Sequence, residues 1–218
     1  MVAIFVVATI IVFMIIDYFV QRSEKRAAAT APAAPAHSKA RFVIPKGYFF
    51  GKGHTWVEVM SNGMARVGVD DFVQRIVGKV ESVSAVPVGT AVHAGDKLFT
   101  VSQGKNILSF RAPISGKLAA FNEDLSTLPR LVNDEGYNGG WVAVIQPTDL
   151  SGEIRNLPIG DEAARWLKEE IRKFRNFITA QIAPSTAATM VDGGTPVEGA
   201  LQHVAPSVWE KFENDFLA

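Results

Sequence analysis

One lysine of this chain is placed where a primary amine could do chemistry, in a polar turn between two apolar runs. The runs are Leu98–Val101 and Ile107–Phe110, and Lys105 lies in the polar stretch 102–106 that joins them. β-branched and aromatic residues on both sides of a break that contains Gly and Asn predict a β-hairpin. Lys105 is therefore expected at or beside the hairpin tip, with its amine in water. For an arbitrary hairpin, the simplest interpretation is a solvated lysine.

Short motifs surround this hairpin in a fixed order. Before it come His-Thr-Trp-Val at 54–57 and Val-Gly-Val-Asp-Asp-Phe at 67–72. After it come Pro-Ile-Ser-Gly at 113–116, Asn-Glu-Asp-Leu at 122–125, Leu-Val-Asn-Asp-Glu-Gly-Tyr at 131–137 and Gly-Trp at 140–141. The series runs from about Pro45 to Leu150, and it resembles the H protein of the glycine cleavage system, a lipoyl-carrying relative of the biotinyl/lipoyl domains.

The resemblance implies a fold and a cofactor. The fold would be mainly β, a flattened lipoyl/biotinyl-type barrel or sandwich over residues 45–150, and lipoate would be attached covalently to Lys105. The family's lysine normally lies in Glu-Ser-Val-Lys-Ala, whereas this chain reads Ser-Gln-Gly-Lys-Asn from Ser102 to Asn106. Ser102 thus takes the position of the acidic residue that the family's ligase uses in recognition. Biotin is disfavoured, because no methionines flank the lysine.

The resemblance also implies a function without catalysis by the chain itself. A lipoyl arm would carry an aminomethyl or related group from a pyridoxal-dependent glycine decarboxylase to a folate-dependent aminomethyltransferase, and a flavin dehydrogenase would reoxidise the arm. The alternative is a non-catalytic adaptor in a membrane-associated assembly, such as an electron-transfer complex, with Lys105 unmodified. No catalytic residue is expected in either case.

Composition excludes several other classes of protein. The 22 basic and 22 acidic residues balance, so no nucleic-acid footprint is expected. The absence of cysteine excludes disulfides, thiol catalysis and Cys-ligated metal sites. The 4 histidines are scattered and none is at metal-ligand spacing, so no metal site is predicted. No nucleophile–base motif or phosphate loop stands out.

The N-terminal residues 1–21 predict a single membrane anchor. The run Val2–Val20 is apolar apart from Thr9, Asp17 and Tyr18, and about 20 residues just span a hydrocarbon core. Basic residues follow the run rather than precede it, which disfavours a cleaved signal peptide. They also place the body of the protein on the cytoplasmic side of the inner membrane. Residues 22–44, rich in Ala and Pro, are expected to form a semi-extended linker.

Within the β region, several local elements can be predicted. Asn62-Gly63 favours a tight hairpin with positive φ angles. Asp70 is expected to cap a short helix at Asp71–Val77, which Gly78 would end. Strands are predicted at Lys79–Val86 and Trp141–Ile145, with a loop at Leu125–Gly140.

The C-terminal third predicts helices. In the region 151–182, an amphipathic helix should begin at Gly160 or Asp161 and reach about Ala180, with an apolar stripe and a Glu169–Lys173 ion pair. Residues 183–218 predict a linker and a short helix at Ser207–Leu217, capped by Ser207 with Glu210. So short a helix must dock on a protein, either its own barrel or a partner.

Overall fold

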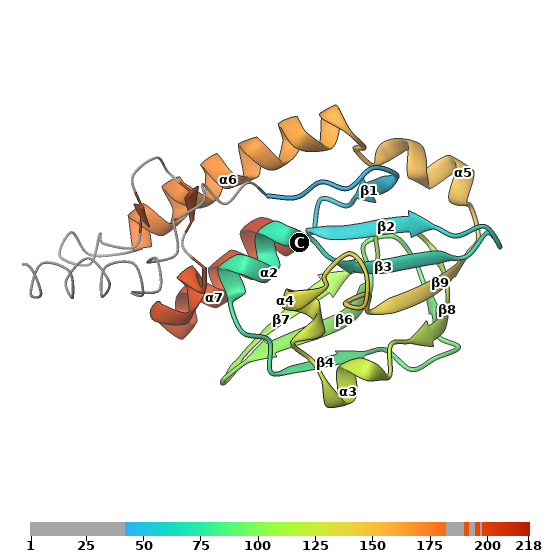
Figure 1. Ribbon diagram of the computed structural model, residues 1–218, viewed down its shortest axis with the longest axis horizontal. Helices are drawn as coiled ribbons and strands as arrows, with labels where there is room; N and C mark the ends of the chain where they lie inside the picture. Colours follow the sequence, from blue (N-terminus) through green and yellow to red (C-terminus); the bar gives the residue numbers. More distant parts are fainter. Residues whose placement is uncertain (1–41, 182–189, 192–194, 197) are drawn as a thin grey trace, which may run out of the picture. The chain divides into compact units, whose positions relative to one another are not determined.

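The computed structural model describes residues 42–181, 190–191, 195–196 and 198–218 (Figure 1). The predicted anchor, residues 1–21, and the linker as far as residue 41 lie outside the described residues. In the part of the chain that is described, no helix is both long enough and apolar enough to cross a membrane.

Two antiparallel sheets form the body of the domain. The larger has six strands in the order β1 (Tyr48–Phe50), β2 (Thr55–Val59), β3 (Ala65–Val69), β9 (Ala143–Pro147), β8 (Gly116–Phe121) and β5 (Ala91–Val92). The smaller has three strands in the order β4 (Ser82–Ala85), β6 (Lys97–Gln103) and β7 (Asn106–Arg111). A short pair, β10 (Met190–Val191) and β11 (Thr195–Pro196), lies apart from both sheets in the topology. The prediction of a mainly-β domain with C-terminal helices is confirmed.

Alternate residues of both sheets meet in one hydrophobic core. Fully buried members from the larger sheet include Val57, Val67, Leu118 and Ile145. Those from the smaller sheet include Leu98, Phe99, Leu108 and Phe110. Alternate side chains of a strand point to opposite faces, so burial of every second residue fixes the register of a strand. β6 departs from this alternation at Leu98 and Phe99, which are both buried beside a register shift between Lys97 and Phe99.

Helix α2 (Asp71–Val77) follows β3 as the sequence predicts. The Asp70 side chain accepts a hydrogen bond from the Val73 amide at 2.9 Å, and Gly78 ends the helix with φ of +75°. The strand that follows is shorter than predicted, because Asn133 Oδ1 takes the Val80 amide and ladder pairing begins later.

Two turns differ from their sequence predictions. Between β2 and β3, only Gly63 has a positive φ, +79°, while Asn62 accepts a hydrogen bond from the Met64 amide with its side chain. A loop of this kind needs one left-handed residue rather than two. The stretch predicted as the loop Leu125–Gly140 holds two single-turn helices, α3 (Asp124–Thr127) and α4 (Leu131–Asp134), which are too short to show a helical period. The strand predicted to start at Trp141 is β9, which starts at Ala143.

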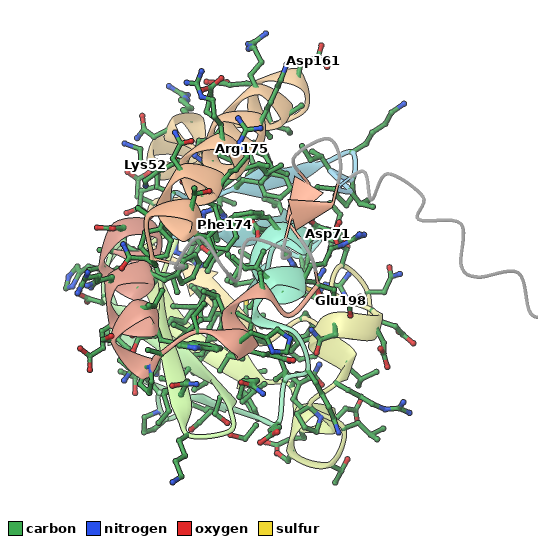
Figure 2. The ribbon with its side chains drawn as sticks, turned by 90° about the vertical axis from the view of Figure 1, so that its left-hand side faces the viewer. Lys52, Asp71, Asp161, Phe174, Arg175 and Glu198 are labelled. Atoms are coloured by element: carbon green, nitrogen blue, oxygen red, sulfur yellow. The ribbon has the colours of Figure 1, made fainter. Side chains whose placement is uncertain are left out.

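A long helix covers β1 and β2 (Figure 1). After α5 (Leu150–Glu153) and a 3₁₀ turn, η1 (Ile154–Asn156), α6 runs over Asp161–Gln181. The predicted stripe is confirmed, with Ala163, Leu167, Phe174 and Ile178 buried and Ile171 half-buried. Figure 2 shows Phe174 on the side of α6 that faces the rest of the domain.

The predicted ion pair on α6 is wrong. Lys173 Nζ lies 3.5 Å from Glu170 and donates to the Asp215 carbonyl at 2.6 Å, while Glu169 pairs with Arg172. Lys173 does not pair with Glu169, because its amine bonds to the C-terminal segment instead.

The C-terminal segment docks on its own domain. It comprises η3 (Ala200–His203), α7 (Pro206–Phe212) and a π-helical turn, η4 (Glu213–Leu217). Ser207 does not cap α7, because the helix begins one residue earlier at Pro206, which suits the first helical position. The apolar residues Val208, Trp209, Phe212, Phe216 and Leu217 are buried. Phe212 and Phe216 stack on each other and meet Phe174 and Phe177 of α6 edge-on.

A buried ionic cluster joins α6 to the sheet. His54, fully buried and with φ of +59°, has its Nδ1 2.7 Å from Asp70 Oδ2 and its Nε2 3.7 Å from Glu170 Oε2. Burial alone would lower the pKa of His54, but the two carboxylates outweigh it and raise that pKa to about 9. Burial would raise the pKa of Glu170, yet His54 and Lys173 hold it below its usual range. His54 is therefore a buried cation at neutral pH.

The cluster predicts a pH dependence of stability. The folded-state pKa of His54 lies above its ordinary value of 6.5, so its contribution is complete below about pH 6.5 and is lost as pH rises through about 9. The free energy of unfolding should fall by up to about 3 kcal/mol over this window. In His54→Asn, which tolerates a positive φ, most of that fall should disappear. Urea unfolding between pH 6 and about 10 measures the free energy of unfolding of the wild-type protein and of His54→Asn. An equal fall with pH in the two proteins would contradict the ionic role of His54.

Because the C-terminal segment is docked through buried aromatic residues, we expect truncation of one of them to lower the stability of the domain strongly. Phe212→Ala should lower the free energy of unfolding by about 3 to 5 kcal/mol, because it opens a cavity between α6 and α7. Leu128→Ala, at an exposed apolar residue, is the control and should change stability by less than about 0.5 kcal/mol. Urea unfolding of the two variants decides whether α7 belongs to this fold, since a loose α7 would leave both unchanged.

Candidate functional site

Lys105 lies at the tip of the β6–β7 hairpin. Gln103 pairs with Asn106, so the connection is the two residues Gly104 and Lys105, a shorter turn than the predicted 102–106. Gly104 has φ of +59°, which matches the glycine that a type II′ hairpin turn requires at its first central position. Both turn residues are exposed. The amine of Lys105 is thus held in water at the end of a tight hairpin.

The hairpin stem is rigid because its lower part is buried. Phe99 and Phe110 pair across the strands, with their rings stacked at a centroid distance of 4.9 Å. Val101 and Leu108 pair nearer the tip and are also buried. Ile107, next to the turn, is by contrast 61% exposed. The stem residues that face the core are thus buried, whereas the tip is exposed to solvent.

One acidic residue that sequence reasoning missed lies at this tip. Glu81 precedes β4, and its Oε2 accepts a hydrogen bond from the Gly104 amide at 3.1 Å. Its own amide donates to the Ser102 carbonyl at 2.9 Å. The position of Glu81 could have been inferred from the pairing of the two strands, because β4 lies antiparallel to β6 and Ser82 is opposite Ser102.

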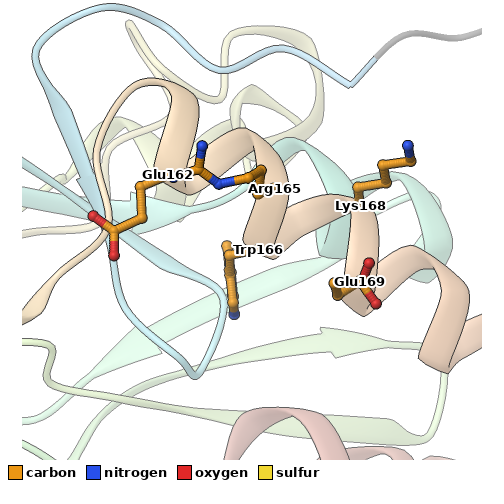
Figure 3. A pocket seen from close by; sticks show the side chains of 5 residues that line it. All are labelled: Glu162, Arg165, Trp166, Lys168 and Glu169. Atoms are coloured by element: carbon orange, nitrogen blue, oxygen red, sulfur yellow. The ribbon is translucent and has the colours of Figure 1, made fainter.

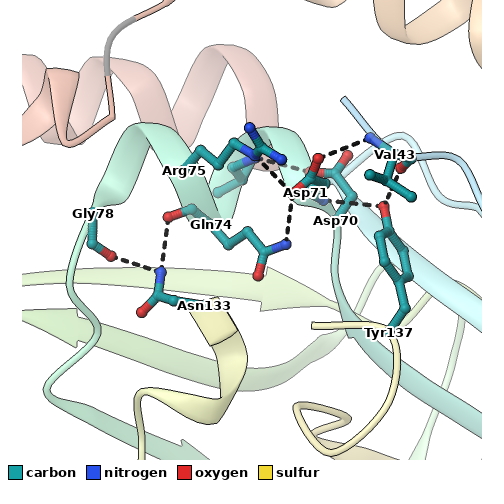
Figure 4. Close-up of polar contacts among 9 residues, drawn as sticks. Val43, Asp70, Asp71, Gln74, Arg75, Gly78, Asn133 and Tyr137 are labelled. Carbon is teal, nitrogen blue, oxygen red and sulfur yellow. Dashed lines mark hydrogen bonds and ion pairs between the residues drawn. The ribbon is translucent and has the colours of Figure 1, made fainter. Parts of the chain in front are cut away.

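The motifs that surround the hairpin in the sequence hold the framework together. Tyr137 donates its hydroxyl hydrogen to the Val43 carbonyl at 2.9 Å and accepts from the Asp71 amide at 3.1 Å (Figure 4). Asn133 donates to the carbonyls of Gln74 and Gly78, which ties α4 to α2. Strong burial raises the pKa of the Tyr137 hydroxyl, so the group stays a neutral hydrogen-bonding partner. These contacts position chain segments and offer no group for reaction.

The other motifs have similar structural roles. Trp56 of the His-Thr-Trp-Val motif lies over Gly68, where an added Cβ would come 2.4 Å from the indole ring. Asn122 donates to the carbonyls of Gly139 and Trp141. In the turn after the hairpin, the Ser115 amide donates to Glu153 Oε2 of α5 at 2.6 Å.

Two hollows on the described surface lie along α6, and Lys105 lines neither. Glu162, Arg165, Trp166, Lys168 and Glu169 line one of about 510 Å³ (Figure 3). Lys52, Trp166, Glu170, Lys173, Asp215, Phe216 and Ala218 line the other, of about 370 Å³. Within the described residues, no group of three or more His, Cys, Asp or Glu side chains could hold a metal ion. The candidate site is the hairpin tip, where the exposed amine of Lys105 is carried by a buried stem.

Comparison with known proteins agrees with this geometry. The family model described as "Glycine cleavage H-protein" matches residues 48–170, which include both sheets and the first half of α6. Among solved structures, the crystal structure of a glycine cleavage system H protein from Mycobacterium marinum aligns with a TM-score of 0.52 at 25% identity. That alignment covers 57% of this chain and 99% of that one.

Relatives in several organisms match the same region. The glycine cleavage system H protein 4 of Aquifex aeolicus is 34% identical over 132 residues, which is 61% of this chain and 76% of that protein. The H protein of Anoxybacillus flavithermus is 35% identical, over 58% of this chain and 98% of its own length. A probable H protein of Pyrococcus horikoshii is 33% identical, with coverages of 58% and 94%. Because the family model spans more than half of the sequence and these relatives match over most of their length, the chain belongs to the glycine cleavage H-protein family.

Proposed function

We propose that this protein is a carrier that holds a lipoyl group in amide linkage on Lys105. The observation that supports this most directly is the exposed lysine at the tip of a tight, well-anchored hairpin in a member of the H-protein family. A lipoyl amide supplies a dithiolane on a long flexible arm, which accepts and releases a small group as it moves between enzymes. As in the family, that group is an aminomethyl or a related group, and the partners are the glycine cleavage enzymes.

The residues at the tip suit such an arm. A carrier must keep the base of its arm fixed while the arm itself is free, and the buried pairs Phe99–Phe110 and Val101–Leu108 fix the stem. Gly104 turns the chain so that Lys105 is one of the two residues at the tip of the hairpin. Once Lys105 carries the lipoyl group, the transfer chemistry takes place on the dithiolane and in the partner enzymes, as expected of a carrier rather than an enzyme.

We further propose that the carrier is tethered to a membrane. The support is in the sequence, where an apolar run of residues 2–20 precedes Arg22, Lys25 and Arg26. The carrier domain would lie on the cytoplasmic side of the inner membrane, on a linker rich in Ala and Pro. Tethering would confine the arm to enzymes at the membrane surface.

The proposal predicts the mass of the native protein. Protein purified from its own membranes should carry the increment of one lipoyl amide, and peptide fragmentation should map it to Lys105. Intact-protein mass spectrometry measures this. Fully processed protein with an unmodified Lys105 would contradict the carrier and favour the adaptor alternative.

Replacing the lysine separates the two functions. Lys105→Arg keeps the positive charge and the exposed position but cannot form the amide, so all lipoylation and all carrier activity should be lost while the melting temperature stays the same. Lys117→Arg, at another exposed lysine in a strand, is the matched control and should keep both. Glycine-dependent reduction of the arm by the purified cleavage enzymes is the assay. Activity that survives Lys105→Arg would exclude the carrier.

A further inference from the structure

Glu81 is held at the carrier hairpin by the backbone of the smaller sheet. Its amide donates to the Ser102 carbonyl at 2.9 Å, directly beside the Ser82–Ser102 pair that ends the β4–β6 ladder. Figure 1 shows β4, β6 and β7 side by side in the lower part of the domain. The position of Glu81 relative to the tip is therefore set by strand pairing.

The side chain of Glu81 completes the turn. In a two-residue hairpin, the amide of the first central residue has no partner within the turn, and here that is the Gly104 amide. Glu81 Oε2 accepts from it at 3.1 Å, a hydrogen bond strengthened by the charge of the acceptor. A carboxylate is thereby fixed against the residue that immediately precedes Lys105.

Position 102, by contrast, contributes no charge. The hydroxyls of Ser102 and Ser82 are 2.5 Å apart, so the two face each other across the strands. The negative charge at the turn comes instead from Glu81, the residue before β4. Glu213 is a second acid bonded to the hairpin, at the Ser109 amide, but Ser109 pairs with Thr100, well below the turn.

We propose that Glu81 is the specificity-determining residue by which a modifying enzyme selects Lys105. This rests on the proposed lipoyl function. The amide forms when the neutral amine Nζ attacks the carbonyl carbon of a lipoyl adenylate. The bond between that carbon and the phosphate oxygen breaks, AMP leaves with the bonding electron pair, and Nζ releases one proton. Other lysines of the described part, such as Lys52 and Lys117, are exposed and carry the same amine, so selection must use the surroundings.

Glu81 supplies two such features. It bonds the Gly104 amide and so holds the backbone of the turn that carries Lys105. It also places a negative charge that a basic group on the modifying enzyme can bind, and charge complementarity of this kind discriminates between partners. Because Glu81 is exposed, its replacement leaves the core intact.

Loading of the full-length chain tests the inference. The probe is lipoate with ATP and a purified lipoate–protein ligase, and intact mass reports the fraction loaded over time. Glu81→Gln keeps a hydrogen-bond acceptor but removes the charge, and it should slow loading by about tenfold, the value of one charge-assisted contact. Glu213→Gln, the matched control on the same hairpin, should load at the wild-type rate.

A rescue variant isolates the charge. Ser102→Glu added to Glu81→Gln returns a carboxylate to the tip from β6, and it should restore most of the rate. A Glu81→Gln protein that loads as fast as wild type, or one that Ser102→Glu fails to rescue, would overturn the role of Glu81 and leave the carrier proposal standing. Wild-type protein that never loads would instead refute the carrier proposal, and this inference with it.

Discussion

The fold depends on one buried carboxylate, that of Asp70. Its Oδ1 begins α2 by accepting the Val73 amide, and its Oδ2 holds the ring of His54. His54 in turn reaches Glu170 on α6. A fully buried carboxylate is tolerated only when it is paired and hydrogen-bonded, and Asp70 meets both conditions. Asp70 thereby links a strand, a short helix and the long C-terminal helix.

The residues that hold the fold together in this protein differ from the residue that would carry the chemistry. The tyrosine, asparagine, glycine and tryptophan motifs shared with the family satisfy buried polar groups or allow close packing. Lys105 presents its amine to solvent at the tip of a hairpin whose stem is buried. A carrier needs this arrangement, because its partners supply the catalysis and recognise a shape. Family membership thus follows from the framework, whereas lipoyl carriage depends on the tip.

The C-terminal additions protect an edge of the carrier sheet. β7 is an outer strand, and outer strands expose unpaired amides that invite aggregation. Glu213 accepts the Ser109 amide, and the aromatic residues of α7 and η4 pack between the sheet and α6. These residues lie beyond the family match, which ends at 170. The extra helices therefore complete this chain's own fold and leave the tip of the hairpin open.

Local sequence determined the elements whose cause is local. The cap at Asp70, the end of α2 at Gly78, the stripe of α6 and the turn at Lys105 were all predictable, because each depends on a few adjacent residues. Tertiary structure alone decided which charges meet. Glu170 reaches His54, Lys173 turns from Glu169 to Asp215, and Glu81 binds Gly104, each across many residues of chain. Long side chains reach whichever neighbour packing brings close, so no local spacing specifies their partners.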